Sequence, residues 1–137
     1  MLRKEQKIKN MRLNTGIITD KLEETKSFYV NKLGFTIVWE ADWFMLLATP
    51  NEADTISFLS PNHLTQELSN FREPFSGKGI YLTVEVDNVD LYFEEIKKSG
   101  IDIALNIRSE EWGDRHFAVI DPNNIAIDFV THTKAEE

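Results

Sequence analysis

The sequence contains no cysteine and no long hydrophobic run. Disulfides, thiolate nucleophiles and cysteine-ligated zinc are therefore excluded, and a cysteine-free chain fits a reducing compartment, so we expect a cytoplasmic protein. No stretch approaches the roughly 18 consecutive apolar residues of a membrane-spanning helix. Basic residues are scarce too, because 15 Lys and Arg face 23 Asp and Glu, a formal net charge of −8. Such a surface repels nucleic acid and anionic lipid, and it accepts neutral or cationic small ligands more easily.

The 137 residues, 42% hydrophobic and 28% charged, are typical of one globular domain. The first eleven residues differ, because they hold four basic residues and one acidic residue. No apolar segment of the kind found in signal peptides follows them. We therefore predict a polar extension at 1–11 and a single domain at 12–132.

The first half of that domain reads as one strand, one helix and three strands. Residues 12–18 form a strand-like run, and Asp20 is an expected N-cap with Glu23 as its capping-box partner. The helix that follows should end at Gly34, a typical residue just beyond a helix C-terminus. Three strand-like runs complete the unit, at residues 35–40, 42–49 and 54–60.

The same order recurs after a polar connection at 61–78. A strand at 79–86 precedes a helix that we expect Asp87 to cap and Gly100 to end. Three further strands are predicted at 101–107, 115–120 and 125–130. The sequence thus predicts an α+β fold made of two βαβββ repeats, at 12–60 and 79–132.

Short motifs lie at corresponding places in the two halves. The first half carries Lys21-Leu22-Glu23, Phe28-Tyr29 and Leu33-Gly34-Phe35, and the second carries Val86-Asp87-Asn88-Val89-Asp90, Trp112-Gly113-Asp114-Arg115 and Asp121-Pro122-Asn123-Asn124. In this order and spacing they resemble the vicinal oxygen chelate superfamily, which includes glyoxalase I, bleomycin-resistance proteins and extradiol dioxygenases. The resemblance covers about residues 12–132. Asn124 stands where the family has glycine.

The resemblance implies mixed sheets that curl around a cleft, and a homodimer. Metal-using members place His, Gln or Glu on the first and last strands of each unit, and the equivalent positions here are Asn14, Ser57, Tyr81 and Asp128. Only Asp128 is a common ligand of divalent ions, because such sites prefer imidazole and carboxylate groups. The three histidines are not spaced to chelate an ion together. We therefore expect no cofactor, although a divalent metal stays possible.

Strand alternation then predicts the residues that face the cleft. Tyr81, Thr83 and Glu85 should share one face, and pairing across a turn at 121–124 would set Phe117 opposite Asp128. The expected ligand-binding residues are Asn14, Ser57, Tyr81, Thr83, Trp112, Arg115, Phe117 and Asp128. In this register Arg115 joins Asp128, either to bind ligand or only to satisfy that carboxylate, and His116 points away from the cleft.

The aromatic residues suggest how a ligand would be held. Trp112 lies in a polar run, where a core tryptophan is unexpected, so its ring is a candidate for stacking on a planar or cationic ligand. Trp39, Trp43 and Phe44 are interpreted as core or dimer interface.

Three functions stay open from the sequence. The first is a metal-free protein that sequesters a small planar or cationic molecule, as in bleomycin resistance. The second is a lyase, isomerase or dioxygenase resembling glyoxalase I, with Asp128, Tyr81 and Glu85 as candidate catalytic residues. The third is an interaction module with a vestigial cleft. No nucleic-acid or membrane partner is expected.

Overall fold

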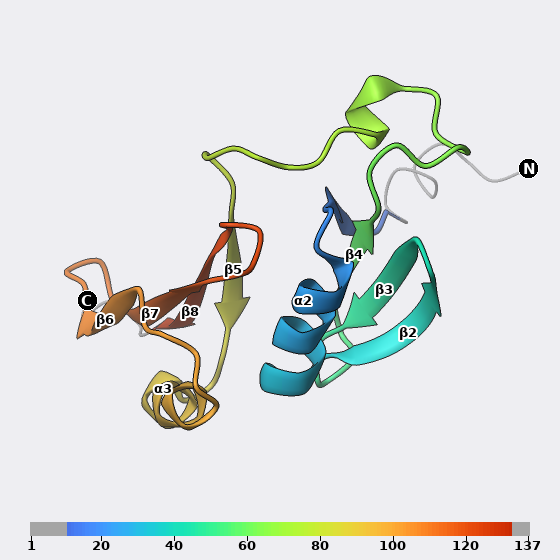
Figure 1. Ribbon diagram of the computed structural model, residues 1–137. Helices are drawn as coiled ribbons and strands as arrows, with labels where there is room; N and C mark the ends of the chain where they lie inside the picture. The colour runs from blue at the N-terminus through green and yellow to red at the C-terminus, as the bar shows by residue number, and fades with distance from the viewer. Residues whose placement is uncertain (1–10, 133–137) are drawn as a thin grey trace, which may run out of the picture.

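The computed structural model describes residues 11–132 and shows two βαβββ modules joined by a long connection (Figure 1). The predicted extension at 1–11 lies outside the described residues except for Met11. The first module consists of β1 (Thr15–Ile18), α2 (Leu22–Lys26), its continuation η1 (Ser27–Lys32), β2 (Thr36–Ala41), β3 (Phe44–Ala48) and β4 (Thr55–Leu59). The second consists of β5 (Tyr81–Glu85), α3 (Val89–Lys98), β6 (Leu105–Ser109), β7 (Asp114–Ile120) and β8 (Ala126–His132). The predicted α+β repeat is confirmed.

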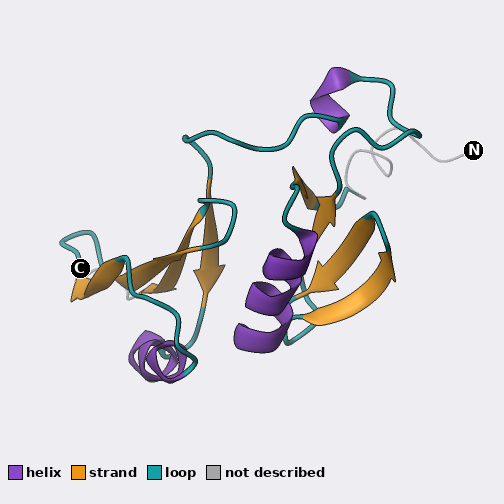
Figure 2. Ribbon diagram, viewed as in Figure 1, coloured by secondary structure: helices purple, strands orange, loops and turns teal. Residues whose placement is uncertain are grey.

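Each module builds one mixed four-stranded sheet with the same topology. Sheet A has the order β1-β4-β3-β2, and sheet B has the equivalent order β5-β8-β7-β6. In each sheet the first and last strands of the module are parallel neighbours, and the remaining pairs are antiparallel. Figure 2 shows the two groups of strands as separate units, each with its own helix. None of the helices within residues 11–132 is long and apolar enough to span a membrane.

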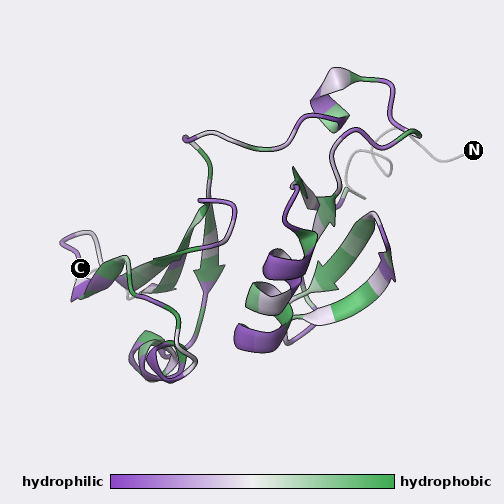
Figure 3. Cartoon of the chain, in the orientation of Figure 1, coloured by the Kyte–Doolittle hydropathy of each residue, from purple (hydrophilic) through white to green (hydrophobic). Residues whose placement is uncertain are grey.

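One hydrophobic core serves both modules. It combines Phe28 and Phe58 of the first module with Phe93, Phe117 and Phe129 of the second. The strands of sheet A are largely hydrophobic, whereas the turns and the outer surface of α2 are more hydrophilic (Figure 3). Because each sheet packs one face on this shared core, its other face is left open in the single chain.

The helix ends differ in part from the prediction. Gly34 and Gly100 follow the two helices with φ of 82° and 84°, values that favour glycine, so both predicted ends are confirmed. The predicted caps Asp20 and Asp87 are wrong. The hydroxyl of Thr19 accepts the N–H of Lys21 at the start of α2. Asn88 caps α3 by accepting the N–H of Leu91.

A buried hydrogen-bond network ties the first helix to the second module. The hydroxyl of Tyr29 donates to Oδ2 of buried Asp121 at 2.8 Å. Oδ1 of that carboxylate accepts the backbone N–H groups of Asn123 at 2.7 Å and Ile125 at 2.9 Å. The Asn123 side chain in turn bonds Thr19 and Thr25 of the first module. The Phe-Tyr and Asp-Pro motifs therefore hold the modules together.

The connection at 61–78 contains only a 3₁₀ turn, η2 (Ser69–Phe71). The N–H of Phe75 donates to the carbonyl of Ile18, at the edge of β1, and the Phe75 ring packs against the core. His63, nearer the start of the connection, stacks on Trp43 in the turn between β2 and β3.

Candidate functional site

The open face of sheet A brings two of the predicted residues together. Asn14 Nδ2 donates to Thr55 Oγ1 at 2.7 Å, and Ser57 Oγ donates to Asn14 Oδ1 at 3.1 Å. Gly16 lies beside them, since a Cβ there would sit 3.3 Å from Ser57 Oγ. The amide and hydroxyl groups at these two positions are therefore neutral and occupied with each other.

The positions equivalent to family metal ligands do not fit a divalent ion. Asn14 and Ser57 offer weak neutral oxygens, and Tyr81 is 67% exposed on the edge strand of the other sheet. Asp128 is a suitable ligand, but Thr83 is its direct neighbour across β5 and β8. Within residues 11–132 no group of three or more His, Asp or Glu side chains is arranged to hold a metal ion. Zinc, nickel and iron(II) sites need several such ligands.

The loop between β7 and β8 overturns the predicted register of sheet B. The N–H of Asp121 donates to the carbonyl of Ile125, and the N–H of Asn124 donates to the carbonyl of Asp121. Three residues form the loop, and Asn124 has φ of 63°, as expected for a turn that ends in a left-handed residue. The prediction takes all four residues 121–124 as the loop. The predicted pairing of β7 with β8 therefore differs by one residue from the observed register.

This one-residue difference reverses which side chains share a face with Asp128. Ala118, not Phe117, lies opposite Asp128. Phe117 is fully buried, with its ring stacked on Phe129 at a centroid distance of 5.1 Å. Arg115 lies on the helix side and binds both carboxylate oxygens of Asp90 in α3, at 2.8–3.2 Å. The expectations that Phe117 lines the cleft and that Arg115 meets Asp128 are therefore wrong.

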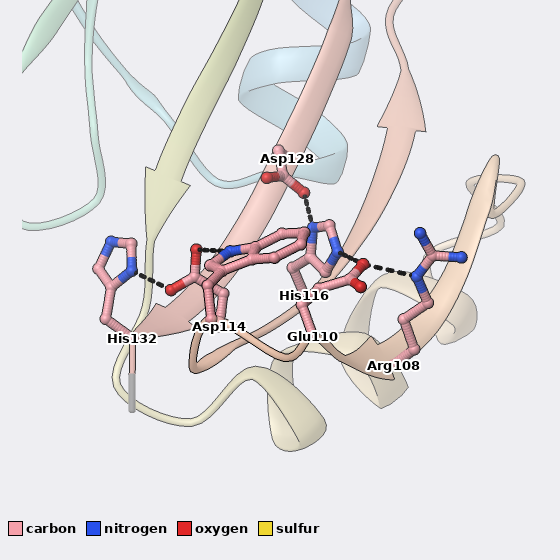
Figure 4. Close-up of polar contacts among 7 residues, drawn as sticks. Arg108, Glu110, Asp114, His116, Asp128 and His132 are labelled. Carbon is pink, nitrogen blue, oxygen red and sulfur yellow. Dashed lines mark hydrogen bonds and ion pairs between the residues drawn. The ribbon is translucent and has the colours of Figure 1, made fainter. Parts of the chain in front are cut away.

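His116 takes the place predicted for Arg115. Its Nδ1 lies 2.7 Å from Asp128 Oδ1, and its Nε2 lies 2.7 Å from Glu110 Oε2. Figure 4 shows this row extended by Arg108, whose Nε lies 2.6 Å from the same Glu110 oxygen. Partial burial opposes the charge, but the hydrogen bonds to Glu110 and Asp128 raise the pKa of His116 above its ordinary value. The hydrogen bond from His116, followed by that from Arg108, lowers the pKa of Glu110.

A second polar row runs beside the first. Asp114 accepts the indole N–H of Trp112 at 3.0 Å, and its other oxygen lies 2.6 Å from His132 Nδ1. His132 Nε2 lies 3.3 Å from Glu85 Oε1. The hydrogen bond to Asp114 raises the pKa of His132, and the same bond lowers the pKa of Asp114. The Trp112 ring is 66% exposed, so it is available for stacking.

Aromatic rings gather at the hairpin that joins β2 and β3. The Trp39 ring lies 6.1 Å from Trp43 and 5.7 Å from Phe44, measured between centroids. His63 from the connection stacks on Trp43, with 4.0 Å between the ring centroids. Trp39 is 51% exposed. A bulge in β2 between Ile37 and Trp39 pairs Trp39 with Leu46.

A cavity of about 380 Å³ adjoins this aromatic cluster. Phe44 belongs to both. The cavity is lined by Leu22, Glu23, Lys26, Glu40, Ala41, Asp42, Phe44 and Met45. Lys26 is paired with Glu40 at 2.7 Å, and this hydrogen bond raises the pKa of Lys26. Three carboxylates against one lysine make the cavity acidic, which suits a cationic ligand.

Three comparisons with known proteins agree with this architecture. A bleomycin resistance protein of Geobacillus stearothermophilus is 29% identical over 121 residues, which are 83% of this chain and 91% of that protein. A glyoxalase/bleomycin resistance protein/dioxygenase from Nocardioides superposes with a TM-score of 0.75 at 18% identity, over 97% of this chain and 93% of that chain. TnmS3, an antibiotic binding protein from Streptomyces, gives a TM-score of 0.70 at 17% identity, over 90% and 98% of the two chains.

The family of the chain follows from a match over most of its sequence. Residues 12–129, which contain both modules and the connection, match the profile of the Glyoxalase/Bleomycin resistance protein/Dioxygenase superfamily. The matched range includes the Tyr29–Asp121 hydrogen bond that joins the modules. The chain belongs to the glyoxalase/bleomycin resistance protein/dioxygenase superfamily.

Proposed function

We propose that this chain is a metal-free binding protein that sequesters a small planar, cationic molecule. The carrying observation is the cluster of Trp39, Trp43 and Phe44, which is partly exposed on the hairpin beside an acidic cavity. Exposed aromatic rings hold planar and cationic groups by stacking and by attraction to the ring face. The bleomycin resistance relative and the antibiotic-binding neighbour support a small-molecule ligand.

Binding of this kind needs no catalytic group. The family positions at Asn14 and Ser57 are neutral and bonded to each other, so they offer nothing to polarise a substrate. Affinity would come from desolvation of the aromatic faces and from the carboxylates around the ligand's positive charge. We also propose that the protein works in the cytoplasm.

A homodimer fits the distribution of exposed apolar side chains. Val38 and Trp39 on β2, and Ile80 and Tyr81 at the start of β5, are each more than half exposed in the single chain. We propose that a second copy covers part of these surfaces and completes the binding cleft. Light scattering at micromolar concentration should give twice 15.9 kDa, and a monomeric mass would contradict the dimer.

The aromatic cluster is tested by a titration that follows tryptophan fluorescence. Proflavine, a planar cation, and riboflavin, a planar neutral molecule, serve as probes in buffer that contains EDTA. Trp39→Ala should weaken proflavine binding by about 5- to 150-fold, because stacking of a base on an aromatic ring contributes about 1–3 kcal/mol. Leu91→Ala, which removes a side chain that is 60% exposed on α3, should leave the affinity unchanged. Equal affinities for wild type and Trp39→Ala would reject the cluster as the binding site.

An acid–base enzyme is the second candidate, because Asp128 and His116 are hydrogen-bonded on the open face of sheet B. Against it, both nitrogens of His116 already meet carboxylates, and Tyr81 and Glu85 lie on the exposed edge strand. Turnover of a bound compound that disappears in Asp128→Asn would favour the enzyme.

A further inference from the structure

The two modules meet at two junctions that are related by the repeat. At the first junction the start of the first module contacts the turn between β7 and β8, where the Asn123 side chain bonds Thr19 and Thr25. At the second junction the roles are exchanged, because β5 and α3 share a cavity with the turn between β3 and β4. The turns at 49–54 and 121–125 are equivalent, since in each the first residue donates its N–H to the carbonyl of the last at 2.9 Å.

The second junction lacks the hydrogen bonds that close the first. Asn51 Oδ1 accepts the hydroxyl of Thr49 and the N–H of Ala53, both within its own turn. Tyr92, the fourth residue of α3, stands at the position that Thr25 occupies in α2. The hydroxyl of Tyr92 has no hydrogen-bond partner among residues 11–132. Burial raises the pKa of Tyr92, so the hydroxyl keeps a proton to donate.

A cavity of about 370 Å³ lies at the second junction in place of a network. Its walls come from both modules, with Phe35 and the β3–β4 turn on one side and Tyr92 and residues 83–86 on the other. Consecutive strand residues point to alternate faces, so four in a row line one cavity only where it follows the backbone edge of the strand. β5 is the edge strand of sheet B on the side of the first module (Figure 1). The cavity therefore runs along the free edge of β5.

The backbone of β5 presents unpaired groups to this cavity. The N–H of Val86 donates to the carbonyl of Val130 in β8 at 2.9 Å. Because backbone groups alternate between the two edges of a strand, those of Thr83 and Glu85 point away from β8 and toward the cavity. No N–H group within the described part of the chain, residues 11–132, donates to the carbonyl of Glu85. An edge of this kind is a template for an added hydrogen-bond donor.

The chain itself shows how such an edge is covered. β1 is the equivalent strand of the first module, and after it the N–H of Thr19 donates to the carbonyl of Leu59 at 2.9 Å. Ile18 therefore corresponds to Glu85. The N–H of Phe75 donates to the carbonyl of Ile18 at 2.8 Å, and the Phe75 ring packs against the core. The edge of β1 is thus covered by an amide N–H with an aromatic ring beside it.

We propose that the second junction binds a neutral molecule that carries an aromatic ring beside an amide, as Phe75 does at β1. The amide N–H donates to the carbonyl of Glu85, and the amide oxygen accepts the hydroxyl of Tyr92. The ring lies against Phe35 and Pro50, which give the cavity an apolar wall. The volume suits one small ligand, because such cavities usually measure about 300–1,000 Å³. This site is separate from the aromatic hairpin, so the inference goes beyond the function proposed above.

The experiment is an NMR titration of the isotope-labelled protein with N-acetyl-L-phenylalaninamide, which has the ring and the amides of a phenylalanine residue. N-acetyl-L-alaninamide, which lacks the ring, is the control ligand. The first probe should shift the amide signals of Asn51, Glu85 and Val86, with a dissociation constant of about 1 mM or below. The control ligand should leave these signals in place. Shifts confined to the aromatic hairpin, equal shifts with both probes, or no shifts overturn the inference.

Tyr92→Phe tests the amide contact in the same titration. It removes only the hydroxyl, since the ring still packs on Phe129. It should weaken binding of N-acetyl-L-phenylalaninamide about two- to tenfold, as expected for the loss of one hydrogen bond. Leu91→Ala is the matched control, because this neighbouring side chain of α3 is exposed and does not line the cavity. It should leave the affinity unchanged.

The outcomes separate this inference from the proposed function. Equal affinities of wild type and Tyr92→Phe for N-acetyl-L-phenylalaninamide overturn the inference and leave the function at the hairpin standing. Proflavine should bind Tyr92→Phe as it binds the wild type, and a loss of proflavine affinity in that variant overturns the separation of the two sites. Binding of N-acetyl-L-phenylalaninamide at residues 83–86 by a protein that does not bind proflavine supports the inference and rejects the proposed function.

Discussion

Replacing Tyr29 with phenylalanine tests the network that joins the modules. The hydroxyl is one of four donors to the buried Asp121 carboxylate, with two backbone N–H groups and, at 3.4 Å, the amide of Asn123. Tyr29 is 1% exposed and its pKa is raised by burial and by the neighbouring Asp121, so the hydroxyl stays a donor at every ordinary pH. A hydrogen bond to a charged group contributes about 1.5–3 kcal/mol.

Since the other donors still serve Asp121, we expect a loss of about 2 kcal/mol in the free energy of unfolding. The measurement is urea unfolding followed by circular dichroism, with the m-value checked for constancy. Tyr92→Phe is the control, because the Tyr92 hydroxyl has no hydrogen-bond partner among residues 11–132 and its ring packs on Phe129 in either variant. That control should change stability by less than about 0.5 kcal/mol. Equal losses in the two variants would refute the network's role.

Further predictions concern the core, the corrected register and the histidines. Phe117→Ala should cost about 3–5 kcal/mol in the free energy of unfolding by urea, because it opens a cavity in the shared core. Arg115→Ala should lower the melting temperature yet leave proflavine affinity unchanged, since Arg115 binds Asp90 away from the open face; a loss of affinity would contradict the register. For His116 and His132, whose pKa values are raised by folding, the contribution to stability is fully present below the unfolded pKa of about 6.5 and is lost as pH rises through the folded pKa. The melting temperature should therefore fall as the pH rises above about 6.5, and His116→Gln with His132→Gln should flatten that fall.

The repeat was predictable because it depends on local signals. The strand-like runs and the glycines at 34 and 100 are signals that act over a few residues, and the structure confirms the elements they predict. The prediction of the helix caps was wrong because local signals did not single out one residue. Several polar residues precede each helix, and only the fold shows that Thr19 accepts the N–H of Lys21 and that Asn88 accepts the N–H of Leu91.

The sheet B site was less predictable because it depends on a single residue of register. The turn that ends in left-handed Asn124 has three residues where four were expected, and this one-residue difference moves His116 onto the face assigned to Arg115. The Pro-Asn-Asn run was the available signal, since asparagine tolerates positive φ. The stacking of His63 on Trp43 could not be foreseen, because it joins a connection without periodicity to a hairpin.

The central claim is that the protein holds a planar cation without metal and without changing it. The most direct measurement is calorimetric titration of bleomycin, after which the related resistance protein of Geobacillus stearothermophilus is named, into protein dialysed against EDTA, with the recovered ligand analysed by mass spectrometry. We expect saturable binding, weakened about fivefold or more by Trp39→Ala, and a ligand of unchanged mass. Binding that requires a divalent ion, or a ligand recovered chemically altered, would contradict it.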